Sequence, residues 1–195
     1  MRSGELEGMI LAGNREDIRR EKRLQLGLLA AAFSILLLLS VGVGGCGVVG
    51  VAERAISPRI GFRAPDFTVK TLSGKESRLE DELGTPVFVN FFATRCPFCR
   101  VEMPYIQALY EELGDKVTFM IIDLQESKDT VESYFQAAGW TVPVYLDATA
   151  AVGKRFNVRG IPVSFFIDSD GIIRDMFIGA MTEKRLRQGI ESILP

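Results

Sequence analysis

The 195-residue chain contains no histidine, and this absence excludes several kinds of active site. Cys–His and Ser–His catalysis, Cys₂His₂ zinc sites and histidine-ligated haem all need an imidazole. Covalent c-type haem attachment is excluded as well, because it needs a histidine after the second cysteine and Arg100 follows Cys99 here. The formal net charge of −2 also lacks the basic excess that is typical of nucleic-acid-binding proteins.

Cysteine is scarce, with residues only at positions 46, 96 and 99. Three cysteines cannot form a disulfide framework, and a closed all-thiolate zinc site needs four. The lone pair Cys96-Pro97-Phe98-Cys99 therefore favours redox chemistry over metal binding. The sequence predicts neither a metal nor a bound cofactor.

Charged residues are missing altogether from Leu24 to Ala52, and the first part of this run is strongly apolar. A membrane-spanning helix needs ~20 such residues, whereas a buried soluble helix would show a polar side every few residues. Basic residues are in excess before the run, which predicts that the N-terminus stays in the cytoplasm. We expect residues 1–23 to form a cytoplasmic tail and residues 24–45 a transmembrane signal anchor. The rest would then lie outside the membrane, where disulfides persist.

The stretch Val43-Gly44-Gly45-Cys46 resembles a loose bacterial lipobox, in which the cysteine becomes lipidated after cleavage. It lies far from Met1 for such a signal, although Met9 could be a start. We favour an uncleaved anchor, and both alternatives tether the protein to the outer face. Residues 46–63 are rich in small residues and predict a linker, followed by one domain over residues 64–195.

Hydrophobic periodicity in the C-terminal domain predicts strands that alternate with helices. Extended segments are expected at 66–71, 76–79, 87–93, 117–123, 142–146, 163–168 and 172–178. Helices are expected at 79–84, 96–113, 127–138, 148–156 and 182–194, with Ser127, Asp147 and Thr182 as caps. This order predicts an α/β domain with a central mixed sheet and helices on both faces, parallel in the middle and antiparallel at one edge.

The two close cysteines follow the apolar strand at 87–93 and open the helix at 96–113. Helix N-termini favour anions, and a thiolate is an anion. We expect Cys96 to be the exposed attacking sulfur. Cys99, one turn further in, would resolve the mixed disulfide. The alternative is a pair of buried, inert thiols.

Several short motifs stand in a defined order along the C-terminal domain. They are Ala64-Pro65-Asp66-Phe67, the strand at 87–94, the stretch from Cys96 to Pro104, the stretch from Gly160 to Asp168, and Asp170-Gly171. Over about residues 61–194 the chain resembles the membrane-anchored thiol–disulfide oxidoreductases of bacteria, the TlpA/ResA-like group. The resemblance implies a thioredoxin fold and a single-pass protein of the bacterial cytoplasmic membrane, with its catalytic domain on the periplasmic side.

The resemblance also implies roles for three further residues. Ile161 and Pro162 match the family's cis-proline loop, which faces the cysteines and offers backbone to an extended substrate. Glu102 falls where this group has an acidic residue that accepts a proton from the second cysteine, here Cys99, or tunes both thiols. A solvated surface glutamate is the alternative reading of Glu102.

Two residues depart from the family pattern. Arg95 stands where tryptophan is usual, and Phe98 stands where proline is usual. We expect both to contact substrates, and the cation of Arg95 to favour the Cys96 thiolate. Because residues in and beside the motif help to set the reduction potential, these departures leave the direction of electron transfer open.

The leading hypothesis is an enzyme that reduces disulfides of client proteins through a redox-active Cys96–Cys99 pair. By resemblance, apocytochrome c is the leading client, in cytochrome c biogenesis, and a membrane thiol donor supplies electrons. The alternatives are a peroxiredoxin-like thiol peroxidase, a disulfide-forming oxidase and a non-enzymatic binding module. Against the peroxidase, Asn90 stands where the peroxidase motif has proline, and Thr94 is only two residues before Cys96.

Overall fold

The computed structural model describes residues 55–195 of the chain. The predicted tail, the transmembrane anchor, Cys46 and the first part of the linker lie outside the described residues. Within residues 55–195, no helix combines the length and the apolar character that crossing a membrane requires.

A seven-stranded mixed sheet forms the centre of the domain, in the order β2-β1-β5-β4-β3-β6-β7. The strands are β1 (Thr68–Thr71), β2 (Glu76–Arg78), β3 (Val87–Phe92), β4 (Thr118–Leu124), β5 (Val144–Asp147), β6 (Val163–Ile167) and β7 (Ile173–Ile178). The three central strands β3, β4 and β5 are parallel, and every other pairing is antiparallel. The predicted mixed sheet is confirmed. The prediction that only one of its edges is antiparallel was wrong. The β1–β2 hairpin adds to β5 in the antiparallel sense, so both edges are antiparallel.

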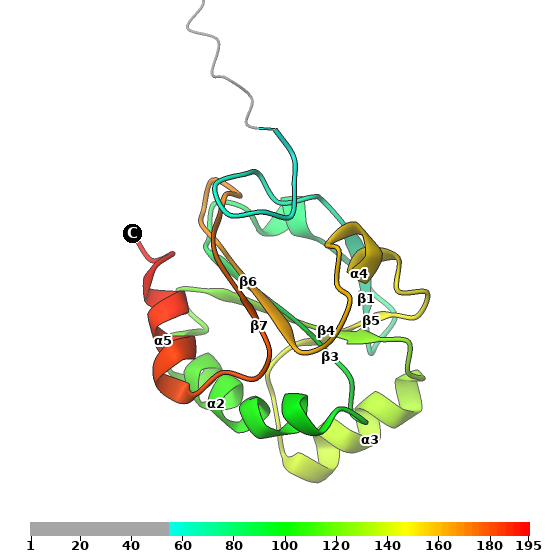
Figure 1. The fold of residues 1–195 in the computed structure, drawn as a ribbon. Helices are drawn as coiled ribbons and strands as arrows, with labels where there is room; N and C mark the ends of the chain where they lie inside the picture. The colour runs from blue at the N-terminus through cyan, green and yellow to red at the C-terminus, as the bar shows by residue number, and fades with distance from the viewer. Residues whose placement is uncertain (1–54) are drawn as a thin grey trace, which may run out of the picture. The chain divides into compact units, whose positions relative to one another are not determined.

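Helices cover both faces of the sheet (Figure 1). They are the 3-10 helix η1 (Leu79–Glu82) and the α-helices α2 (Pro97–Leu113), α3 (Lys128–Ala138), α4 (Ala151–Arg155) and α5 (Glu183–Glu191). The helices α2, α3 and α5 lie against one face, whereas α4 and the segment before β1 lie on the other. The cysteine pair therefore belongs to the three-helix face.

Strand β3 is buried along its whole length and separates two apolar cores. Phe88 and Phe92 pack with Cys99 and the inner faces of α2, α3 and α5. The alternate residues, among them Val89 and Phe91, pack with α4 and the hairpin. A strand covered on both faces reads as a continuous apolar run, which is how its position at the centre of the sheet could be predicted.

Side-chain caps fix two of the helix starts as predicted. Ser127 accepts a hydrogen bond from the Thr130 N–H, and Thr182 accepts one from the Arg185 N–H. The predicted helix at 148–156 is shorter, because α4 begins at Ala151. Asp147 still serves that helix, since its carboxylate accepts hydrogen bonds from the amides of Ala151 and Gly153.

Residues 56–63, predicted as the end of the linker, are hydrogen-bonded to the folded domain. The Gly61 N–H donates to the Ile173 carbonyl, and the Ile173 N–H donates to the Phe62 carbonyl. The domain therefore begins earlier than residue 64. Residues 56–63 take a defined conformation because they form backbone hydrogen bonds with β7, the edge strand of the sheet.

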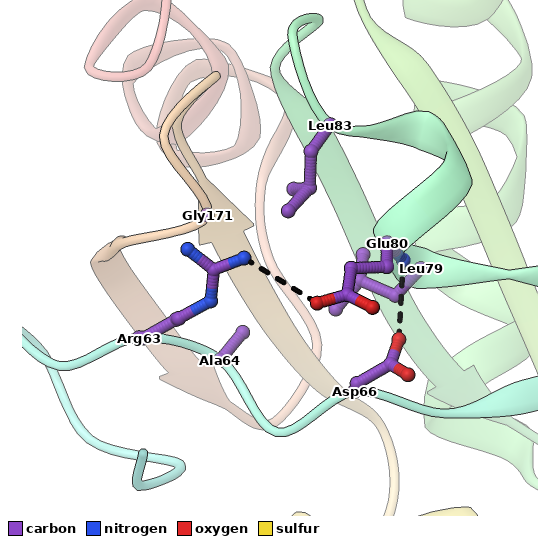
Figure 2. A pocket seen from close by; sticks show the side chains of 7 residues that line it. All are labelled: Arg63, Ala64, Asp66, Leu79, Glu80, Leu83 and Gly171. Atoms are coloured by element: carbon purple, nitrogen blue, oxygen red, sulfur yellow. Dashed lines mark hydrogen bonds and ion pairs between the residues drawn. The ribbon is translucent and has the colours of Figure 1, made fainter. Parts of the chain in front are cut away.

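A small pocket forms where the Ala-Pro-Asp-Phe motif meets η1 (Figure 2). In it Arg63 pairs with Glu80 at 3.6 Å, and Asp66 accepts a 3.1 Å hydrogen bond from the Glu80 N–H. Neither cysteine of the Cys-x-x-Cys pair lines this pocket. The motif's polar contacts are thus structural, because they attach the start of the domain to η1.

Candidate active site

Cys96 is the N-cap residue of α2, directly after the strand β3 and a short turn. Its Sγ accepts a hydrogen bond of 3.2 Å from the Cys99 N–H and is half-buried. Pro97 occupies the first turn of the helix, where its missing N–H costs nothing. The strand–turn–helix geometry therefore holds this sulfur at the positive end of a 17-residue helix.

Cys99 lies one turn further along α2 and is fully buried. Both cysteines are free thiols. Burial, the hydrogen bond with Cys96 and the charges of Cys96 and Glu102 together raise the pKa of Cys99 far above the ordinary value for a thiol. The two sulfurs therefore differ in access and in ease of ionisation, which is the asymmetry that an attacking and a resolving cysteine require.

Glu102 is also fully buried, so the alternative of a solvated surface glutamate is wrong. Its carboxylate accepts hydrogen bonds of 2.8 Å from the Asn90 amide and 2.9 Å from the Met181 N–H. Burial raises the pKa of Glu102 to about 7, against the opposing effect of these two hydrogen bonds. A group with that pKa exchanges protons readily near neutral pH.

The Ile161–Pro162 loop faces the cysteine pair, and its peptide bond is cis. The Cys96 thiol donates to the Ile161 carbonyl at 3.7 Å. Pro162 is buried, whereas Ile161 is half-buried. The loop before β6 and the start of α2 thus meet at the sulfur of Cys96.

Arg95 and Phe98 lie on either side of Cys96 in the sequence and both reach the surface. The Phe98 ring is 68% exposed. Arg95 pairs with Glu126 at 3.0 Å and also donates to the Leu124 carbonyl. Arg95 is therefore held against the protein, whereas Phe98 projects into solvent beside the reactive sulfur.

A pair of carboxyl groups behind Arg95 was not predicted from the sequence. Glu126 accepts hydrogen bonds from the Thr94 N–H at 2.6 Å and from the Thr94 hydroxyl at 3.0 Å. Asp123, fully buried at the end of β4, accepts a 2.9 Å hydrogen bond from the Glu126 N–H. Together they hold the turn that delivers Cys96 to the helix.

The two carboxyl groups divide the charge between them. Burial, then the contact with Glu126 and its charge, raise the pKa of Asp123 to about 8. Burial acts in the same direction on Glu126, but hydrogen bonds from Asp123, Thr94 and Arg95 outweigh it and lower the Glu126 pKa. Near neutral pH Asp123 is therefore mostly protonated, and Glu126 carries the charge. The signal in the sequence was an acidic residue ending an otherwise apolar strand.

Within residues 55–195, no three cysteine or acidic side chains are grouped as metal ligands. The residues that the structure brings together around Cys96 are instead those of a dithiol site. They are Cys99 and Glu102 on α2, the Ile161–Pro162 loop, and the flanking residues Arg95 and Phe98.

Comparison with known proteins gives one consistent result. The model of the AhpC/TSA family matches residues 60–176. The thioredoxin-like protein YneN of Bacillus subtilis is 32% identical over 80% of this chain and 94% of its own length. The thiol-disulfide oxidoreductase ResA of Geobacillus thermodenitrificans is 34% identical over 83% of this chain and 93% of its own length.

Solved structures agree with these sequence matches. A thiol:disulfide interchange protein of the thioredoxin family from Chlorobium tepidum superposes with a TM-score of 0.62. It is 30% identical in sequence, and the match covers 68% of this chain and 96% of that one. The predicted thioredoxin fold is thereby confirmed for the described domain.

Proposed function

The chain belongs to the AhpC/TSA family of thioredoxin-like proteins and is a thiol–disulfide oxidoreductase, and on this basis we propose that it reduces client disulfides through Cys96 and Cys99. The observation that carries this proposal is the asymmetry of the pair. Cys96 is half-buried at a helix N-terminus and accepts a hydrogen bond from the Cys99 N–H, whereas Cys99 is fully buried. Such a pair can attack a substrate with one sulfur and release it with the other.

The reaction proceeds in two exchanges. The Cys96 thiolate attacks one sulfur of the client disulfide, so that a Cys96–client disulfide forms and the client's second sulfur leaves as a thiolate. Cys99 then loses its proton and attacks the Cys96 Sγ, so that the Cys96–Cys99 disulfide forms and the client's first sulfur leaves. Two electrons have passed to the client, and a membrane thiol donor must supply two more to reduce the Cys96–Cys99 disulfide again.

Glu102 is the proposed acceptor of the Cys99 proton. Burial raises the pKa of Glu102 to about 7, which makes its carboxylate a stronger base than an ordinary glutamate. Cys99 needs such a base nearby, because burial also raises the pKa of its thiol. Glu102 lies three residues after Cys99 on the same helix, a spacing that puts two side chains on one helix face. Asn90 and the Met181 N–H hold its carboxylate in place.

The client chain is proposed to bind across the Ile161–Pro162 loop. An extended peptide there would meet the Ile161 backbone, whose carbonyl lies 3.7 Å from the Cys96 Sγ. Phe98 would supply an apolar contact, because its exposed ring stands next to the reactive sulfur. Arg95 would contact the client from the other side of Cys96.

The proposed cellular location rests on the sequence of the N-terminal segment. We propose that residues 24–45 anchor the protein in the bacterial cytoplasmic membrane, with residues 1–23 inside and the catalytic domain on the periplasmic side. The uncharged apolar run and the basic residues before it support this orientation. Apocytochrome c is proposed as a client on the strength of the family resemblance alone.

Trapping the first mixed disulfide tests the proposed function. In a Cys99→Ser variant the resolving sulfur is absent, so a client disulfide should stay covalently bound through Cys96. A Cys96→Ser, Cys99→Ser variant is the matched control, because it retains Cys46 and should trap nothing. If no covalent complex with a client forms and the protein turns over hydrogen peroxide rapidly, the proposal is contradicted and a peroxidase is favoured.

A further inference from the structure

A surface groove is lined by Arg95, by the end of β4 and the residue after it, by α4 and by residues 158–161. Two of its lining residues adjoin Cys96. Arg95 directly precedes Cys96, and the carbonyl of Ile161 accepts a hydrogen bond from the Cys96 thiol. A client bound over the Ile161–Pro162 loop would therefore place its neighbouring residues in this groove.

Three cationic residues line the groove, namely Arg95, Lys154 and Arg159, and no carboxylate does. We call it the basic groove. Of these, Arg95 is compensated by Glu126 at 3.0 Å. Lys154 and Arg159 are exposed, and neither forms an ion pair with any carboxylate in residues 55–195. The chain as a whole carries a net charge of −2, so this local positive excess is not a property of the surface in general.

The two adjacent cations of α4, Lys154 and Arg155, differ in what they contact. The Arg155 guanidinium donates a hydrogen bond to the Asp66 carbonyl and so ties α4 to the segment before β1. Lys154, one residue earlier, makes no such contact within residues 55–195 and lines the groove instead. The two adjacent cations therefore have different uses, one structural and one free to meet a ligand.

Backbone geometry singles out the same place. The non-glycine residues with positive φ in residues 55–195 are Gln125 (66°), Ala150 (55°) and Asn157 (55°). The first two line the groove, and the third directly precedes the lining residue Val158. Left-handed backbone is unfavourable for residues with a Cβ, and such strain concentrates at functional sites.

We propose that the basic groove binds an acidic side chain of the client, one or two residues from the cysteine that Cys96 attacks. This inference rests on the proposed function and deepens it, because it names the class of client: segments with aspartate or glutamate beside the reducible disulfide. Opposite charges at the rim of a binding site raise the rate of association and make it sensitive to salt. The charge of Arg95 is compensated by Glu126, so Lys154 and Arg159 supply the uncompensated charge.

The test compares two synthetic peptides, each with one intramolecular disulfide, that differ only in a glutamate or a lysine next to the first cysteine. Full-length reduced protein in an uncharged detergent reduces each peptide, and the second-order rate is measured at ~20 mM and ~500 mM salt. We expect the glutamate peptide to react at least about tenfold faster at low salt. The ratio should approach one at high salt, where charges are screened.

Variants separate the groove from the chemistry. In a Lys154→Glu, Arg159→Glu protein the preference should reverse, and in a Lys154→Gln, Arg159→Gln protein it should disappear. Lys75→Glu is the matched control, because this lysine sits in the β1–β2 turn outside the groove and should leave the ratio unchanged.

Each outcome has a defined meaning. Equal rates for the two peptides with the unaltered protein, or a preference that survives in both groove variants, would overturn the inference and leave the proposed function intact. Failure to reduce either peptide would overturn the proposed function itself, together with the inference that rests on it.

Discussion

The side-chain amide of Asn90 donates a 2.8 Å hydrogen bond to the carboxylate of Glu102. Asn90 lies on β3, which leads to Cys96, and Glu102 lies on α2, which carries Cys99. A single buried polar contact thus joins the two elements that present the cysteines. Because an amide cannot accept the proton of a thiol as a carboxylate can, we propose Glu102 rather than Asn90 as the proton acceptor of this site.

A Glu102→Gln variant should resolve mixed disulfides about 10²-fold more slowly than the unaltered protein at pH 8. With the pKa of Glu102 raised to about 7 by burial, the carboxylate forms as pH rises through that value, and the rate should rise with it. The glutamine keeps the shape and one of the two accepting oxygens, and it has no such titration. Stopped-flow measurement of mixed-disulfide decay from pH 5 to pH 9 checks this.

The control for that measurement is Glu111→Gln, an exposed residue on the same helix. It should reproduce the unaltered pH profile. An inflection near pH 7 that persists in Glu102→Gln would contradict proton transfer by Glu102. A faster rate in that variant would show that the charge of Glu102 merely opposes the thiolate.

Asp123→Asn should make the protein more stable at pH 8 and above. An acid whose pKa is raised on folding holds its proton longer in the folded state, so the free energy of unfolding falls as pH rises from the unfolded pKa to the folded one. For Asp123, with a pKa raised mainly by burial, that window runs from 3.8 to about 8. The asparagine removes this loss, which is at most about 6 kcal/mol, because each pKa unit corresponds to about 1.4 kcal/mol.

Urea unfolding at a series of pH values measures the effect. Glu102 contributes a similar loss only up to about pH 7, so the difference between Asp123→Asn and the unaltered protein between pH 7 and 8 belongs to Asp123. Asp170→Asn, in the exposed turn before β7, should leave the slope unchanged. If the free energy of unfolding of Asp123→Asn changes with pH as it does in the unaltered protein, the pKa of Asp123 is not raised on folding, which would contradict this prediction.

Gly189→Ala should destabilise the domain by about 1–3 kcal/mol. A Cβ at Gly189 would overlap the ring of Phe166, which is fully buried where α5 packs on β6. Gly160→Ala is the control, because a Cβ there meets no atom within 4 Å. Thermal unfolding should show a lower midpoint for the first variant and little change for the second. Equal midpoints would mean that α5 does not pack as described.

Much of this architecture could be predicted, because the signals were local. Ser127 and Thr182 cap helices as expected, and the apolar run of β3 correctly indicated a strand buried on both faces. The Cys-x-x-Cys pair and the Ile161–Pro162 loop were found from motifs, and the structure brings them within 3.7 Å of one another.

What could not be predicted depended on contacts between distant segments. The second antiparallel edge arises because β1 pairs with β5, with Thr71 opposite Tyr145 and Lys70 opposite Leu146. Glu126 accepts a hydrogen bond from Thr94, 32 residues earlier, and Lys154 comes to line the same groove as Arg95 only in the folded domain. Spacing along the sequence carries no signal for such pairs, since only the strand order brings them together.

The midpoint potential of the Cys96–Cys99 couple tests the central claim most directly. This potential can be measured by equilibrating the full-length protein with glutathione or dithiothreitol buffers, with the Cys96→Ser, Cys99→Ser variant as the blank. A reductant of client disulfides predicts a two-electron couple near that of thioredoxin, about −270 mV, or lower. A value near about −120 mV, typical of a strong disulfide-forming oxidant, would contradict the account.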